Sequence, residues 1–257
     1  MPSTNNNRLA QQAIEVSGLV RHFGKTEAIR GIDLSIQRGE LFGLVGSDGA
    51  GKTTLMRILA TVMRASAGSA HVAGFDVRRQ ARQIKPLIGY MPQQFGFYGD
   101  LTVIENLRFF SDIYQIPHRE RQSRFERFLG FSGLLPFQKR MAQDLSGGMK
   151  QKLGLACVLI HFPDILLLDE PTNGVDPVSR QEFWQILREM HLQGLTIFVS
   201  TAYLDEAAYC DRVALMHGGK VLALADPGSL QGGHATLEEA VIDHIARTNP
   251  REVALHA

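Results

Sequence analysis

A glycine-rich run from Gly46 to Thr53 carries the residue types that bind phosphate. It reads GSDGAGKT, follows the apolar stretch Leu41–Val45 and leads into a segment of helical character over Lys52–Val62. Glycines let backbone N–H groups curl around phosphate oxygens, and a helix N-terminus adds partial positive charge. The Lys52 ammonium can neutralise the β and γ phosphates, and the Thr53 hydroxyl can bind Mg²⁺. We therefore predict a nucleoside triphosphate site. The expected contacts are Gly46, Ser47, Asp48, Gly49, Ala50, Gly51, Lys52, Thr53 and Thr54.

Two adjacent carboxylates, Asp169 and Glu170, follow the apolar run Ile165–Leu168. Four consecutive apolar residues are typical of a buried parallel strand, and the end of such a strand would deliver both acids to one edge of a sheet. There we expect Asp169 to hold the Mg²⁺ shell through water and Glu170 to polarise an attacking water. The alternative is a pair of solvated loop residues, but the phosphate loop upstream favours the functional interpretation.

The elements that must position these residues alternate along the chain. Strand patterns at Ile14–Val20 and Ala28–Ile36 predict a half-buried antiparallel pair. The remaining strand candidates alternate with helix-like segments, which indicates a mostly parallel, covered sheet. They are Leu41–Val45, Ile88–Tyr90, Ile165–Leu168, Thr196–Val199, Val213–Met216 and, after a turn at Gly218 and Gly219, Lys220–Leu224.

The stretch from about Leu101 to Ile160 breaks this alternation because its patterns are helical only. Thr102 and Glu105 form a capping box before a helix over Val103–Tyr114, and Arg119–Leu129 predicts another. We assign this stretch to an inserted helical lobe.

Further along the chain, Asp176 and Pro177 are typical of a helix start, and this helix should run to about Gln193. Thr236 with Glu239 predicts the cap of a last helix. We predict a single domain over residues 1–257. Its parts are a core at about 12–95 and 161–225, a helical lobe at about 96–160, and a C-terminal helix and tail at about 226–257.

Composition excludes several classes of protein. With 44% hydrophobic and 21% charged residues in 257, the chain has ample material for a core, so it is not disordered. A net charge of +1 favours no nucleic-acid partner. No apolar run is long enough to span a bilayer, and the polar start MPSTNNNRLAQQ predicts no secretory signal, so we expect a cytoplasmic location. Cys157 and Cys210 lack metal or disulfide spacing, and we expect both to be buried.

A third motif, LSGGMKQ, contains Ser146, Gly147 and Gly148, and with it the sequence resembles the ATP-binding subunits of ABC transporters. The resemblance covers nearly the whole chain. It rests on the phosphate loop, GYMPQQ with Gln93, LSGGMKQK, LLLLDEP and NGVDP with Asp176, in that order. It implies an α/β fold: a P-loop NTPase core with a mixed sheet, a small antiparallel β subdomain and an inserted helical lobe. Ser146 and its two glycines would place open N–H groups at a helix start, which makes a second anion site.

The resemblance also implies how the motifs work together. Two such subunits would face head to tail, and the LSGG turn of each would close over ATP held by the phosphate loop of the other, with Mg²⁺ as the second cofactor. Gln93 would contact Mg²⁺ and the attacking water, Asp176 would cross between subunits, and Phe23 would stack on adenine. The alternatives are a Gln93 with local hydrogen bonds only, the same role for Gln94, and a Phe23 packed in the core.

The chain departs from the family pattern mildly at Asp48, where the family often has Asn, and more clearly at a second position. Where the family has a histidine in a run like STHYLDEA, this chain reads STAYLDEA and has Ala202. A histidine would bond the γ-phosphate and help to orient Glu170, and losing such a donor costs on the order of 10²- to 10³-fold in rate. We therefore hypothesise slow turnover at this chain's own site, and an asymmetric heterodimer. The alternative is a working homodimer in which Tyr203 or another group substitutes.

The resemblance implies an ATPase subunit that powers transport through separate integral membrane subunits, at the inner face of the cell membrane. The surroundings of VIENL and STAYLDEA favour export. The family docks a helix of the membrane subunit on the loop that here contains Phe95, Phe97 and Tyr98, although packing against the lobe is the alternative. Two other classes stay open, a soluble ABC protein acting on ribosomes or DNA and an ATP sensor within a heterodimer. The transported substrate stays open as well.

Overall fold

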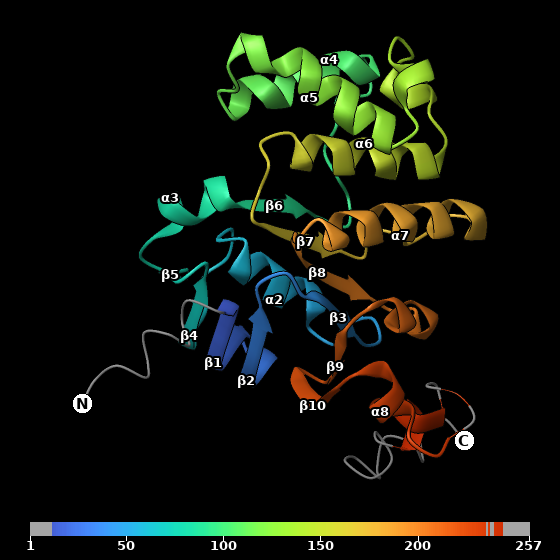
Figure 1. Ribbon diagram of the computed structural model, residues 1–257. Helices are drawn as coiled ribbons and strands as arrows, with labels where there is room; N and C mark the ends of the chain where they lie inside the picture. Colours follow the sequence, from blue (N-terminus) through green and yellow to red (C-terminus); the bar gives the residue numbers. More distant parts are fainter. Residues whose placement is uncertain (1–11, 235, 237–238, 244–257) are drawn as a thin grey trace.

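The centre of the computed structural model, which describes residues 12–234, 236 and 239–243, is a six-stranded sheet (Figure 1). The strand order is β10-β9-β3-β8-β7-β6, and every neighbouring pair is parallel except β9 with β10. The strands are β3 (Leu41–Val45), β6 (Ile88–Met91), β7 (Ile165–Asp169), β8 (Thr196–Thr201), β9 (Arg212–His217) and β10 (Lys220–Ala225). The predicted mostly parallel sheet is confirmed, and each of its predicted strands is present.

Both faces of this sheet are covered, which explains the continuous apolar runs in its strands. Phe42 and Leu44 of β3 point into one hydrophobic cluster, while Leu41 and Val45 point into the other. The same alternation holds in β7 and β8. Because successive side chains of a strand face opposite sides, a strand between two cores carries apolar side chains on both faces.

A second sheet is small and antiparallel, as expected, with the order β2-β1-β4-β5. Its strands are β1 (Gln12–Phe23), β2 (Thr26–Gln37), β4 (Ala67–Val72) and β5 (Phe75–Asp76). The sequence did not predict β4 and β5. The reason is that the β4 segment AGSAHV has little apolar alternation of its own, and its extended form comes from pairing with β1, where Val72 lies opposite Ile14.

The helices divide into a lobe and a core set. They are α2 (Lys52–Leu59), α3 (Ala81–Ile84), α4 (Val103–Ile113), α5 (His118–Phe131), α6 (Gly147–Leu159), α7 (Pro177–Leu192) and α8 (Pro227–Gln231). The helices α4, α5 and α6 gather into the lobe, green to yellow in Figure 1, and α2 lies between the two sheets. The predicted extension of α2 to Val62 is wrong because Thr61 has a φ of +62°, which ends the helix.

The helix and turn signals predicted most boundaries correctly. The Thr102 capping box is present, α7 begins at Pro177, and the Gly218 turn joins β9 to β10. The helix α8 was not predicted. The Glu239 N–H donates to Thr236 Oγ1 (3.2 Å) as the predicted cap requires. The predicted continuation at 244–257 and the N-terminal segment 1–11 lie outside the described residues.

Two further expectations can be compared with the described part of the chain. Cys157 and Cys210 are both buried, as predicted. None of the described helices has the length and apolar character needed to cross a bilayer.

Candidate active site

The phosphate loop leaves β3 and enters α2, as predicted, and its backbone is shaped by glycine. Gly49 and Gly51 have φ values of +78° and +106°, a region that L side chains rarely adopt. A Cβ on Gly46 would lie 2.2 Å from the Met216 carbonyl oxygen. The loop borders a cavity of about 150 Å³, large enough for phosphate groups. This cavity is lined by Ala28, Gly49, Ala50, Gly51, Lys52, Thr53, Thr54 and Glu170.

Lys52 lies at the centre of this loop with its ammonium group nearly buried. Its Nζ donates to the carbonyl oxygens of Gly46 (2.6 Å) and Ser47 (3.0 Å). It also forms an ion pair with Glu170 Oε1 at 2.9 Å, and both side chains are less than a tenth exposed. The pairing neutralises two charges in a dry environment. A triphosphate in this cavity would compete with Glu170 for the lysine.

Asp169, at the end of β7, has one oxygen occupied and one without a partner. Its Oδ1 accepts from Thr53 Oγ1 (3.0 Å) and Ser200 Oγ (2.8 Å). Its Oδ2 is buried and has no hydrogen-bond partner among the described residues. Burial raises the pKa of Asp169, while the Ser200 and Thr53 hydrogen bonds lower it. An unpartnered carboxylate oxygen beside a threonine hydroxyl is a set of hard oxygen donors that suits Mg²⁺.

Glu170 is held at the sheet edge by its backbone and by three side chains. Its φ is +49°, an uncommon value for a residue other than glycine, and such strain concentrates at functional sites. Its N–H donates to the Ser200 carbonyl oxygen at 3.0 Å. Its Oε2 accepts from Gln93 Nε2 (3.0 Å) and Asn173 Nδ2 (3.2 Å), and its Oε1 contacts Lys52. The carboxylate is therefore aimed at the phosphate loop.

The hydrogen bond from Gln93 to Glu170 distinguishes Gln93 from Gln94, the two glutamines that were candidates for a contact with the site. Both Gln93 and Gln94 are exposed, but the contact to the site is made by Gln93. The carboxyl ends of β6 and β7 meet at one edge, and this brings the loop after β6 to the acidic pair.

The LSGG turn does not line the phosphate-loop cavity of its own chain. Ser146 is the N-cap of α6, and its Oγ accepts from the Met149 N–H at 3.3 Å. A Cβ on Gly147 would meet open space, whereas a Cβ on Gly148 would lie 2.4 Å from Ser179 of α7. The turn thus exposes one face and packs the other against α7.

Two residues expected to act at the edge of the site are exposed. Asp176 is the N-cap of α7, its Oδ1 accepts from the Ser179 N–H (3.0 Å), and this hydrogen bond lowers the pKa of Asp176. Phe23 is 44% exposed, with the Arg21 guanidinium 4.6 Å from its ring centre. The core-packing alternative for Phe23 is therefore wrong. Asp48 is exposed as well.

The aromatic residues after Gln93 were expected either to contact a membrane subunit or to pack against the lobe. Phe95 and Phe97 are partly buried against the lobe cluster, and the Phe95 ring stacks on Phe110 at 5.4 Å. Tyr98 is 45% exposed and contacts Phe109. Packing against the lobe accounts for the two phenylalanines, and Tyr98 remains an exposed aromatic.

Ala202, at the position where the family has histidine, is exposed. The ring of its neighbour Tyr203 lies under the guanidinium of Arg180, 4.0 Å from the ring centre. Sequence reasoning missed the buried carboxylate of Glu206 nearby, which is 1% exposed and hydrogen-bonded to Thr172. The only sequence signal was an acidic residue within the alanine-rich end of STAYLDEA.

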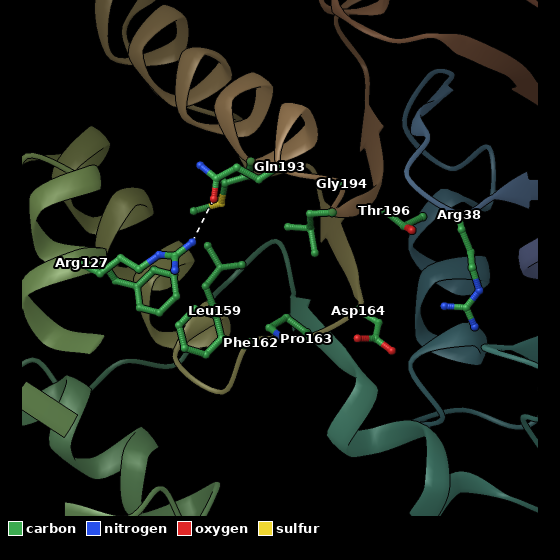
Figure 2. Close-up of a pocket in the computed structure, with 12 residues that line it drawn as sticks. Arg38, Arg127, Leu159, Phe162, Pro163, Asp164, Gln193, Gly194 and Thr196 are labelled. Carbon is green, nitrogen blue, oxygen red and sulfur yellow. Dashed lines mark hydrogen bonds between the residues drawn. The ribbon is translucent and has the colours of Figure 1, made fainter. Parts of the chain in front are cut away.

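A second cavity, of about 390 Å³, lies away from these residues at the amino ends of β7 and β8 (Figure 2). Its walls include Phe162, Asp164 and Thr196, and Arg127 donates to Gln193 Oε1 at its rim (2.9 Å). It contains none of the predicted site residues.

A phosphate loop between a parallel strand and a helix, an acidic strand end and a capped LSGG turn define an ATP-binding cassette of the P-loop NTPase fold. The chain belongs to the ABC transporter family, whose model matches residues 29–173, more than half of the chain. The family resemblance and the predicted fold class are thereby confirmed.

Named relatives and solved structures agree with this assignment. YbhF of Escherichia coli, a probable multidrug ABC transporter ATP-binding protein, is 48% identical over 219 residues. That match covers 84% of this chain but only 38% of YbhF. The daunorubicin resistance ATP-binding protein DrrA3 of Streptomyces coeruleorubidus is 37% identical, with 84% of this chain and 68% of DrrA3 covered. The structure of CbiO1 from Clostridium perfringens, part of the CbiONQ transporter complex, is 27% identical with a TM-score of 0.80, over 96% of this chain and 99% of that one.

Proposed function

We propose that this chain binds and hydrolyses ATP. The observation that carries the proposal is the convergence of Lys52, Thr53, Asp169, Glu170 and Gln93 around the phosphate-loop cavity. Family membership and the family's phosphate-loop chemistry support the same assignment.

In the proposed mechanism the loop amides and the N-terminus of α2 bind the phosphates. Lys52 exchanges Glu170 and its two carbonyl acceptors for oxygens of the γ-phosphate. The freed Glu170 carboxylate, oriented by Gln93 and Asn173, accepts a proton from a water as the water oxygen bonds to the γ-phosphorus and the bond to the β-phosphate oxygen breaks. Mg²⁺, held by Thr53 and Asp169, would neutralise charge on the phosphates when bound.

The test separates binding from hydrolysis. We expect Lys52→Ala to weaken binding of a fluorescent ATP analogue by about tenfold or more, because a buried charge-assisted contact is lost. We expect Glu170→Gln to retain binding and to lower kcat by at least about a hundredfold. Gln93→Ala should lower kcat, whereas its neighbour Gln94→Ala serves as the matched control and should not. A Lys52→Ala chain that holds ATP as firmly as the parent would refute the proposal.

We infer that this ATPase powers export through separate integral membrane subunits, as a peripheral protein at the inner face of the cell membrane. The relatives support this inference, because YbhF, DrrA3 and the linearmycin resistance protein LnrL of Bacillus subtilis are named for multidrug transport or drug resistance. The exposed Tyr98 in the loop after Gln93 suits contact with a membrane subunit. Copurification with a membrane protein tests the inference. Salt-resistant ribosome or DNA association would instead favour the soluble class.

A second candidate function is favoured by Ala202, whose methyl group cannot donate to a phosphate. In this candidate the chain binds ATP, turns it over slowly at its own site and completes a faster site on a different ATPase subunit with its LSGG turn. Ala202→His should then raise steady-state kcat by about tenfold or more. If the parent is already fast and the histidine adds nothing, the candidate is wrong and a working homodimer is indicated.

A further inference from the structure

A buried carboxylate, Glu206, lies behind the position where the family has its histidine. It is 1% exposed, and its two oxygens accept from three donors within the described part of the chain. Thr172 Oγ1 donates to Oε1 (2.7 Å), Arg180 Nε donates to the same oxygen (3.1 Å), and Thr201 Oγ1 donates to Oε2 (2.5 Å). A buried charge needs such partners, because each lost partner leaves an uncompensated group in a dry environment.

Through Thr201 this carboxylate fixes the segment Thr201–Glu206, which we call the switch segment. Thr201 Oγ1 also accepts from the Tyr203 N–H at 3.0 Å. The Thr201 carbonyl oxygen accepts from the Gly46 N–H at 3.3 Å, at the start of the phosphate loop. The backbone on both sides of Ala202 is therefore tied to Glu206 and to the phosphate loop.

Arg180, in the first turn of α7, holds the same segment from its other side. Besides Glu206, its guanidinium contacts both oxygens of Asp205 (3.0 and 3.2 Å) and lies 4.0 Å from the Tyr203 ring centre. One side chain thus contacts three residues of the switch segment. Arginine suits this position because its planar guanidinium can hydrogen-bond a carboxylate and stack on an aromatic ring at the same time.

Ser179, the residue before Arg180, contacts the LSGG turn. A Cβ on Gly148 would lie 2.4 Å from both Cβ and Oγ of Ser179, so the two helices are in the closest contact that glycine allows. A displacement of the LSGG turn toward α7 must therefore move the first turn of that helix, because packed elements do not compress.

We propose that Arg180 and Glu206 are positioning residues, and that the first turn of α7 carries the position of the LSGG turn to the switch segment of the same chain. The LSGG turn would respond to one nucleotide while the switch segment borders the other. The consequence for turnover rests on the proposed ATPase function, but the mechanical link does not.

A nitroxide label at Ala202→Cys measures this link without nucleotide. Cys157 and Cys210 are buried, and burial raises both thiol pKa values, that of Cys210 to about 12, so the label will react at position 202. We expect Arg180→Met to shorten the rotational correlation time of the label about two- to threefold. Arg180→Lys should give an intermediate value. Arg188→Met is the matched control, since Arg188 lies on the same helix and contacts Tyr209 instead.

A second arm tests the connection to the LSGG turn. Gly148→Ala should change the spectrum at position 202, and Gly147→Ala, whose Cβ meets open space, should not. Adding Ser179→Gly to Gly148→Ala removes both clashing atoms and should restore the parent spectrum. An unchanged spectrum in Arg180→Met, or a Gly148→Ala spectrum that Ser179→Gly fails to restore, would overturn the proposal.

The unlabelled chain supplies a kinetic readout. Arg180→Met should lower kcat about tenfold while the affinity for an ATP analogue stays within about twofold, because misplacement of a site costs rate more than binding. Equal loss of affinity and rate would indicate a merely structural role and would also overturn the proposal. The proposed ATPase function fails in a different measurement, namely if Lys52→Ala does not weaken ATP binding. The comparison of nitroxide spectra does not depend on that result.

Discussion

At the scale of single residues, Asp169 is a site residue whose surroundings lower the stability of the folded chain. Its carboxylate is 1% exposed, and no residue in the described part of the chain forms a hydrogen bond with Oδ2. Burial raises its pKa, and the adjacent charge of Glu170 raises it further against the bonds from Ser200 and Thr53. The folded state therefore disfavours the ionised form that a cation would need. Functional groups often carry such a cost in stability.

We predict that Asp169→Asn stabilises the nucleotide-free chain at pH 7 by about 0.5–2 kcal/mol. A carboxyl with a raised pKa in the folded state loses stability as pH rises from about its ordinary value of 3.8 through the raised value. The gain from the substitution should therefore be largest at neutral pH and shrink toward pH 4. Urea denaturation in the presence of EDTA at several pH values measures it.

The matched control for this prediction is Asp164→Asn, which removes an exposed carboxylate just before the same strand and should change stability little. The Asp169→Asn substitution should also weaken the additional stabilisation by Mg²⁺ with ATP, since a neutral amide attracts the Mg²⁺ shell less strongly than a carboxylate does. An Asp169→Asn chain that unfolds at lower urea than the parent at pH 7 would contradict the prediction.

Three of the predicted site residues, Lys52, Gln93 and Asp169, converge because they lie at or beyond the ends of strands that meet at one edge of the sheet. Lys52 follows β3, Gln93 follows β6, and Asp169 ends β7, so the assignment of parallel strands places all three at the same edge of the sheet. Glu206 could not be found this way. Its partners Thr172 and Arg180 are 34 and 26 residues away in sequence, and only the folded chain brings them together.

At the scale of elements, local sequence signals were sufficient to predict a helix or hairpin that carries its own cap or turn. The Thr102 capping box and the Asp176 cap both lie where the sequence predicted them. By contrast, β4 depends on β1 for its extended form. The unpredicted helix α8 has the same start as α7, with Asp226 before Pro227, but it is only five residues long and has no apolar periodicity to signal it.

We predict that Thr102→Ala destabilises the chain by about 1 kcal/mol, because the hydroxyl accepts from the Glu105 N–H at the start of α4. For a chain of this size the melting temperature should fall by roughly 2–4 °C. Ser123→Ala, which removes an exposed hydroxyl within α5, is the control and should not lower the melting temperature, because alanine favours the helix interior. Calorimetry measures both. A Thr102→Ala chain that melts with the parent would show that the lobe does not depend on this cap.

At the scale of the whole molecule, polar contacts join the lobe to the core. Lys152 of α6 forms an ion pair with Glu182 of α7 (2.5 Å), and Arg127 of α5 donates to Gln193 at the rim of the larger cavity (Figure 2). Polar contacts of this kind, each with at least one solvent-accessible partner, contribute little free energy. The contact of α6 with α7 near Gly148 is tighter, so we infer that the LSGG turn moves with α7.

The LSGG turn does not line the phosphate-loop cavity of its own chain, so under the proposed function each chain carries two half-sites, the phosphate loop and the LSGG turn, and a complete site needs a second subunit. Lys52→Ala disables the first half-site and Ser146→Arg the second, and neither variant should dimerise with Mg²⁺ and ATP. In an equimolar mixture, about half of the random pairs regain one complete site, so size-exclusion chromatography should show up to about half of the parent's dimer. A mixture that stays monomeric while the parent dimerises would contradict closure in trans, and a parent that never dimerises alone would indicate a different ATPase subunit as partner.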